Sequence, residues 1–223
     1  MKTSRVAGAF YLPVFLLGPF ALLYVRGVVL VPGDATATAG RLAEHGGLLR
    51  AGSIVEVYLA LTDVVLAALL YVLFRPAGRA AALVMGSLRF TWAVVAAIGA
   101  LGNLVALRLA GNPPAALLLL DLHEDVAAIG FVAFGAHLAL LGALGWRSRL
   151  LPRSIGALLV VAGAGYLTHS LLLLAGTAAP FAIMLPAFPA EVALCLWLLI
   201  KGPAPEPASI GEVGQRVLVK EMR

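Results

Sequence analysis

The sequence predicts an all-α integral membrane protein, a bundle of six transmembrane helices with both termini in the cytoplasm. Of the 223 residues, 62% are hydrophobic and only 12% are charged, and the mean hydropathy is +1.01. A water-soluble domain of this length does not need so apolar a composition to fill its core. The net charge of +5 does not indicate nucleic-acid binding, because the basic residues fall in short loops between apolar runs.

Six segments are long and apolar enough to cross a bilayer, whose hydrocarbon core of about 30 Å needs about 20 helical residues. They cover approximately residues 7–30, 53–74, 80–109, 125–144, 155–175 and 181–200. The first follows two basic residues, as a signal peptide does, but its apolar run is long and lacks the short h-region followed by a convincing Ala-x-Ala cleavage site, so we interpret it as an uncleaved span. The sixth contains Pro186 and Pro189, which interrupt a helix and delay its start.

Two further segments lie between the spans. Residues 36–50 combine Ala, Leu and charged residues, which predicts a surface helix capped by Asp34. Residues 113–122 are too short to span and too apolar to be solvated, so we expect them to lie at the interface or to re-enter the bilayer. We expect one membrane domain over residues 1–202 and a mobile cytoplasmic tail over residues 203–223.

The basic residues are divided unequally between the two sides of this arrangement. One side receives Lys2, Arg5, Arg75, Arg79, Arg147, Arg149, Arg153, Lys201, Arg216, Lys220 and Arg223. The other side receives only Arg26, Arg41, Arg50 and Arg108. Because cytoplasmic loops carry the excess of Lys and Arg, both termini are predicted to lie in the cytoplasm.

Three of the spans carry a pair of polar residues on one helical face. The pairs are Glu56 with Asp63, Arg89 with Asn103, and His123 with His137. Separations of seven or fourteen residues return to nearly the same side of a helix at about 100° per residue. With the spans in alternating directions, a deeper layer contains Asp63, Arg89, His137 and Glu191. An outer layer contains Glu56, Asn103 and His123, together with Glu124, Asp125 and His169.

The deeper layer requires an explanation, because a charge at the bilayer centre costs several kcal/mol. The first interpretation is an Asp63–Arg89 ion pair that neutralises both charges and sets the helix register. Arg89 could equally pair with Glu191. The second interpretation makes the remaining carboxylate and His137 a proton relay or an acid/base pair.

The outer layer is interpreted first as ordinary solvation of residues at the ends of spans. The alternative is a metal or substrate site that uses His123, His169, Glu56 and Asp125, whose side chains are suitable zinc ligands. No HxxxH or HExxH spacing supports a metal, so we predict neither a metal nor a cofactor. The single cysteine, Cys195, excludes a disulfide framework. Tyr11 and other aromatic residues are interpreted as membrane-belt or packing residues.

These observations leave two main classes of function open, and a metal-dependent hydrolase built on the outer histidines comes third. The first is a small transporter-like, sensory or accessory membrane module, whose partner is the lipid bilayer. The alternative is an intramembrane enzyme that acts on a lipid or isoprenoid-like apolar ligand, with Asp63, Glu191 or His137 transferring protons. The candidate ligand-binding residues are Glu56, Trp92, Asn103, His123, Phe134 and His169. The sequence predicts no oligomeric state.

Several phrases of the sequence resemble a bacterial family of six-span membrane proteins, domain of unknown function 4386. They are RVAGAFYL at 5–12, VPGDATAT at 31–38, LLPRSIG at 150–156, GYL at 165–167, and Glu191 followed by LWLLIKG at 196–202. The resemblance covers nearly all of the chain up to Gly202. It implies a single six-helix domain in the bacterial inner membrane, and it implies no activity and no catalytic residues.

Overall fold

The computed structural model describes residues 2–202, and the predicted tail at 203–223 lies outside them. The described chain is helical. Its α-helices are α1 (Lys2–Pro19), α2 (Arg26–Val29), α3 (Ala35–Phe74), α4 (Arg79–Arg108), α5 (Pro113–Ser148), α6 (Arg153–Leu174) and α7 (Ala187–Ile200). Within residues 2–202, six helical units are long and apolar enough to cross a membrane, which confirms the predicted number of spans.

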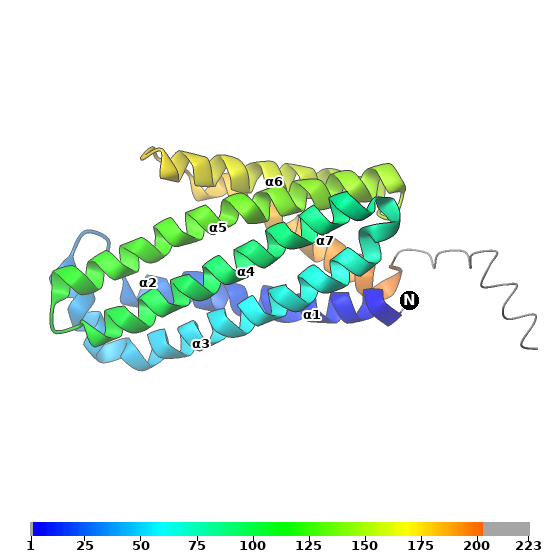
Figure 1. Cartoon of the computed structure of the whole chain (residues 1–223). Coiled ribbons are helices and arrows are strands. Elements are labelled where there is room, and N and C mark those ends of the chain that lie inside the picture. The colour runs from blue at the N-terminus through cyan, green and yellow to red at the C-terminus, as the bar shows by residue number, and fades with distance from the viewer. Residues whose placement is uncertain (1, 203–223) are drawn as a thin grey trace, which may run out of the picture.

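The helices form an elongated bundle in which successive spans run in opposite directions (Figure 1). Helices α3, α4, α5 and α6 pack in chain order, and α1 packs against α3 and α7. The N-terminus, the α3–α4 turn and the α5–α6 turn lie at one end of the bundle, here called the near end (Figure 1). The α2–α3 and α4–α5 connections lie at the opposite, far end.

Helices α3 and α5 are longer than the spans that the sequence predicts. Helix α3 has 40 residues and α5 has 36, which correspond to about 60 Å and 54 Å at 1.5 Å per residue. The predicted surface helix at 36–50 is therefore the first part of α3, which bends at His45. Its cap is confirmed, because the Asp34 Oδ1 accepts a hydrogen bond of 2.9 Å from the Ala37 N–H.

Residues 113–122 do not form a segment of their own, so the prediction that they re-enter the bilayer is wrong. These residues are the first turns of α5 and continue without a break into the fourth span. The physical reason is local. Pro113 occupies the first helical position, where its missing N–H is not needed, and the Ala and Leu residues that follow are strong helix formers. Both α3 and α5 therefore have many more residues than the about 20 that cross a hydrocarbon core.

The first and sixth spans are interrupted, and proline residues mark the interruptions. After Pro19, residues Phe20–Val25 form a π-helix that joins α1 to α2. The sixth span begins with a 3₁₀ turn at Phe181–Met184, and α7 starts only after Pro186, which agrees with the predicted delay. Helix α7 has 14 residues and is about 21 Å long.

The buried apolar side chains form two separate cores. The near core includes Leu66, Leu70 and Phe74 of α3 and Met85 of α4. The far core consists of Val25, Val29, Leu42, Leu49, Ala106, Ala116 and Leu120, with partly buried neighbours. Along α3, α4 and α5, the polar residues of the outer layer occupy positions between the two cores.

Candidate functional site

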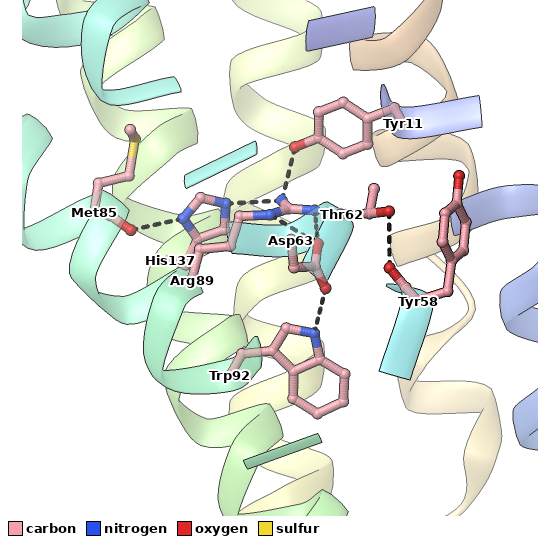
Figure 2. A network of polar contacts seen from close by, with 8 residues as sticks. All are labelled: Tyr11, Tyr58, Thr62, Asp63, Met85, Arg89, Trp92 and His137. Carbon is pink, nitrogen blue, oxygen red and sulfur yellow. Dashed lines mark hydrogen bonds and ion pairs between the residues drawn. The ribbon is translucent and has the colours of Figure 1, made fainter. Parts of the chain in front are cut away.

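Arg89, in the middle of α4, is completely buried and forms the predicted ion pair with Asp63 of α3. The Arg89 Nε donates to the Asp63 Oδ1 at 3.0 Å, and the Nη2 donates to the same oxygen at 2.5 Å (Figure 2). The other carboxylate oxygen, Oδ2, accepts a hydrogen bond of 2.9 Å from the Trp92 Nε1. Both oxygens of this carboxylate therefore have partners.

The remaining Arg89 donors are directed at α1 and α5. The Arg89 Nη1 donates to the Tyr11 hydroxyl at 2.8 Å and lies 3.2 Å from the His137 Nε2. The His137 Nδ1 lies 2.9 Å from the Met85 carbonyl oxygen, which can only accept, so Nδ1 carries the proton and Nε2 accepts from Arg89. The Arg89 Cζ also lies 4.8 Å from the centre of the Tyr11 ring and 5.4 Å from that of Phe134.

These residues are called the Arg89 cluster: Tyr11, Asp63, Arg89, Trp92 and His137. The cluster joins α1, α3, α4 and α5 by side-chain hydrogen bonds at the centre of the bundle (Figure 2). Its polar atoms are directed at each other. Such an arrangement holds the helices in register and leaves little capacity for a ligand.

Tyr11 corrects one interpretation of the sequence. It is fully buried and bonded to Arg89, so it is not a membrane-belt residue. A signal was present, because Ser4, Ala7, Gly8 and Tyr11 recur at helical spacing and form the buried face of α1. The position of Tyr11 on this small-residue face therefore predicts its burial better than its residue type does.

Glu191, the fourth residue of the deeper layer, does not pair with Arg89. It lies near the start of α7 with 6% of its surface exposed, within electrostatic range of Arg89 and Asp63. No hydrogen bond or ion pair joins it to any part of the described chain. The alternative Arg89–Glu191 pair is therefore wrong, because the Arg89 donors are already directed at Asp63, Tyr11 and His137.

The outer layer forms a second group, the Glu56 cluster of Glu56, Asn103 and His123. The His123 Nε2 lies 3.0 Å from the Glu56 Oε2, and the Asn103 Nδ2 donates to the Glu56 Oε1 at 3.3 Å. All three residues are buried, which overturns the solvation interpretation. The reason is the extra length of α3 and α5, since the far core covers the positions at which the sequence places the ends of the spans.

Two buried polar atoms at the Glu56 cluster have no hydrogen-bond partner within residues 2–202. They are the Asn103 Oδ1 and the Arg26 Nη1. The Arg26 Nη2 donates to the Leu120 carbonyl oxygen at 3.0 Å, which holds the guanidinium near Glu56, Asp121 and Glu124. Buried polar atoms of this kind are usually satisfied by ordered water.

A cavity of about 40 Å³ lies between the two clusters. Glu56 and His123 line it from the Glu56 cluster, and Asp63 and Trp92 line it from the Arg89 cluster. The rest of its wall is apolar and includes Leu22 of the π-helical segment and Gly99 of α4. A space of this volume holds a few water molecules.

The other candidate residues lie elsewhere. Phe134 packs on Arg89 and does not line the cavity, while Glu124 and Asp125 are exposed. His169 is buried on α6, and no hydrogen bond joins it to the Glu56 cluster. In the part of the chain that the structure describes, no three His, Cys, Asp or Glu side chains gather as metal ligands.

Comparison with known proteins places this architecture in a family. An uncharacterised protein from the archaeon Archaeoglobus fulgidus is 33% identical over 153 residues, which cover 67% of this chain and 83% of that protein. No solved structure matches. Residues 6–202 match the family described as Domain of unknown function (DUF4386), and the chain belongs to that family.

Proposed function

We propose that this protein is a transporter-like membrane module that moves protons, with the Glu56–His123 pair as the site where protons enter the buried centre. The observation that carries the proposal is the cavity, because it is lined both by this pair and by the Asp63 carboxylate. A carboxylate and an imidazole are the side chains that most readily exchange protons near neutral pH. Water in the cavity would link them to Asp63.

The polar and charged neighbours of Glu56 support its role as a protonation site. Asn103 from α4 and His123 from α5 contact it directly. The Arg26 guanidinium lies within electrostatic range, and Asp121 and Glu124 lie within electrostatic range of Arg26. The two unpartnered atoms, on Asn103 and Arg26, provide places for water to bind at the far side of the pair.

The near core lies between the Arg89 cluster and the near end. In this region, the buried face of α3 carries no polar side chain. Leu66, Leu70 and Phe74 fill this region and are fully buried with Met85. The near core therefore separates the cavity from the near end. A barrier between the buried site and one side of the membrane is what an alternating-access transporter requires in each of its states.

We also propose that the near end lies in the cytoplasm of a bacterium, with the protein in the inner membrane. Eight basic residues belong to the near end: Lys2, Arg5, Arg75, Arg79, Arg147, Arg149, Arg153 and Lys201. The acidic residues Asp34, Glu44, Asp121, Glu124 and Asp125 belong to the far half. This asymmetry supports the orientation.

Labelling of single cysteines tests this orientation, because the native Cys195 is buried. Asn112→Cys is at the far end and Ser154→Cys is at the near end, and both positions are exposed. We expect a membrane-impermeant maleimide to label Asn112→Cys on intact cells and Ser154→Cys only after lysis. The reverse pattern would overturn the orientation.

The proton proposal is tested in liposomes that contain the purified protein and a trapped pH-sensitive dye. Under an imposed membrane potential, the wild-type protein is expected to acidify the lumen faster than empty liposomes do. Glu56→Gln is expected to remove this flux, because the amide keeps the shape of the side chain and cannot exchange a proton. Glu44→Gln, an exposed position of α3, is the matched control. A wild-type flux equal to that of empty liposomes, or an unchanged flux in Glu56→Gln, would overturn the proposal.

The second candidate is the intramembrane enzyme, which gains support from the contact of the cavity with Asp63 and Trp92. The volume of the cavity favours the proton-moving module over the enzyme, because about 40 Å³ is far below the 300–1,000 Å³ that are usual for small-molecule sites. Lipid extraction followed by mass spectrometry separates the two. A stoichiometric apolar compound that is lost when Trp92 is changed to Ala would favour the enzyme.

A further inference from the structure

The charges buried at the centre of the bundle do not balance. Asp63 and Arg89 neutralise each other in their ion pair. Glu191 adds a second carboxylate within electrostatic range of the same two residues, and it has 6% of its surface exposed. A carboxylate that is buried without a cation of its own is strongly unfavourable in a membrane protein.

Within residues 2–202, no neighbouring side chain supplies the missing positive charge. The groups near Glu191 are Arg89 of α4, Asp63 of α3, Tyr11 of α1 and Tyr166 of α6. His137 of α5 also belongs to the Arg89 cluster. It donates through Nδ1 to the Met85 carbonyl and accepts through Nε2 from Arg89, so it is a neutral imidazole.

Arg89 cannot serve both carboxylates in this arrangement. It makes two hydrogen bonds to Asp63, and its Nη1 is directed at Tyr11 and His137. The single positive charge of Arg89 is therefore too little to neutralise both Asp63 and Glu191 when both are ionised. The site is complete only when a further cation binds at Glu191.

We infer that Glu191 is a second proton-binding site and that it holds its proton as a neutral carboxylic acid at neutral pH. A proton is the cation that fits, because it binds to the carboxylate itself and needs no surrounding cavity. On losing the proton, Glu191 competes with Asp63 for Arg89, so its protonation controls the ion pair at the centre of the bundle.

The position of Glu191 gives this site a role that rests on the proposed proton-moving function. Trp92 and Tyr11 lie on opposite sides of the Asp63–Arg89 pair (Figure 2). The cavity lies on the Trp92 side, and Glu191 is within electrostatic range of Tyr11. Glu191 is therefore the proton acceptor beyond Arg89, on the route from the cavity towards the near end.

Infrared spectroscopy of the protein in lipid tests the protonation directly, because a protonated carboxyl has a carbonyl band that a carboxylate lacks. We expect this band at neutral pH in the wild type, and we expect Glu191→Gln to remove it. Glu44→Gln, which changes an exposed glutamate, should leave the band unchanged. Glu191→Asp should shift the band without removing it, which keeps the test decisive if Glu191→Gln folds poorly.

The absence of the band in the wild type would overturn the inference, as would a band that persists in Glu191→Gln or disappears in Glu56→Gln. The role in transport is tested separately by the liposome flux, which Glu191→Gln is expected to remove. A normal flux without the band would overturn that role. A wild-type protein with the band but without flux would instead overturn the proposed function, while the proton site would stand.

Discussion

The Arg89 cluster and the Glu56 cluster place similar side chains inside the same bundle, but they differ in how completely their polar atoms are paired. Arg89 makes four side-chain hydrogen bonds, and both oxygens of Asp63 accept. At the Glu56 cluster, the Asn103 Oδ1 and the Arg26 Nη1 are buried without partners among the described residues, and a cavity adjoins Glu56. The first cluster is saturated and the second is not.

This difference distinguishes buried polar groups that stabilise the helix bundle from buried polar groups that can bind water or a proton. A saturated network strengthens the packing of the helices and resists change, because each broken bond leaves a buried group unpaired. An unsaturated group beside a cavity can bind water or a proton without first breaking the fold. We therefore expect substitutions in the Arg89 cluster to affect stability and substitutions in the Glu56 cluster to affect proton movement.

The largest effect is expected when the central ion pair is broken. Arg89→Ala should lower the free energy of unfolding by about 3–5 kcal/mol, because it leaves the Asp63 carboxylate buried without a cation. Unfolding in detergent micelles measures the change, and Arg108→Ala, exposed at the end of α4, is the control. Asp63→Ala combined with Arg89→Ala should recover part of the loss. A double variant no more stable than either single variant would contradict the ion-pair interpretation.

A smaller effect is expected for Tyr11→Phe, which removes the hydroxyl that accepts from Arg89 and keeps the ring. The expected loss is about 1.5–3 kcal/mol, the usual range for a hydrogen bond to a charged group. Tyr24→Phe changes an exposed tyrosine of the same span and should have almost no effect. Equal stabilities of the two variants would show that the Tyr11 hydroxyl contributes nothing to the cluster.

Two glycines allow the packing of the clusters to be compared. A Cβ at Gly130 would lie 2.7 Å from the Trp92 ring, which stacks on Phe131 at 4.6 Å and has little freedom to move. A Cβ at Gly99 would lie 3.3 Å from the His123 ring, beside the cavity. We expect Gly130→Ala to cost about 1–3 kcal/mol of unfolding free energy and Gly99→Ala to cost less. A greater loss in Gly99→Ala would contradict the difference in packing.

The smallest effect is expected for Asn103→Leu. This change removes a hydrogen bond of 3.3 Å to Glu56, but it also removes the unpartnered Oδ1. The two contributions oppose each other, so the free energy of unfolding should change by less than about 1 kcal/mol. Thermal unfolding of Asn103→Leu and of Tyr11→Phe under the same conditions measures the two losses of stability. A loss as large as that of Tyr11→Phe would mean that the Glu56 cluster is as structural as the Arg89 cluster.

Most of the fold could be predicted because membrane spans are encoded locally. An apolar stretch of sufficient length has few alternatives in a bilayer. The boundaries at the far end could not be predicted in the same way. Residues 113–122 are a separate segment by hydropathy, yet helix propensity continues through them and joins them to α5. Hydropathy marks where lipid ends and does not mark where a helix ends.

The candidate site could be predicted in part. The pairing of Asp63 with Arg89 follows from the need to neutralise two charges, and helical spacing places both on inward faces. The contributions of Tyr11 and Arg26 could not be predicted, because α1 and α2 meet the other helices through contacts distant in the chain. The cavity is likewise a property of how several helices pack.

The sequence by itself determined the number of spans and their polar faces, because each depends on composition and on helical spacing within one segment. The tertiary structure decided that Arg89 pairs with Asp63 and not with Glu191. Only the tertiary structure decided that the Glu56 cluster is buried, that a cavity connects it to Asp63 and that Glu191 has no cation of its own within residues 2–202. The physical reason is that hydrogen-bond saturation depends on the relative positions of atoms from several helices.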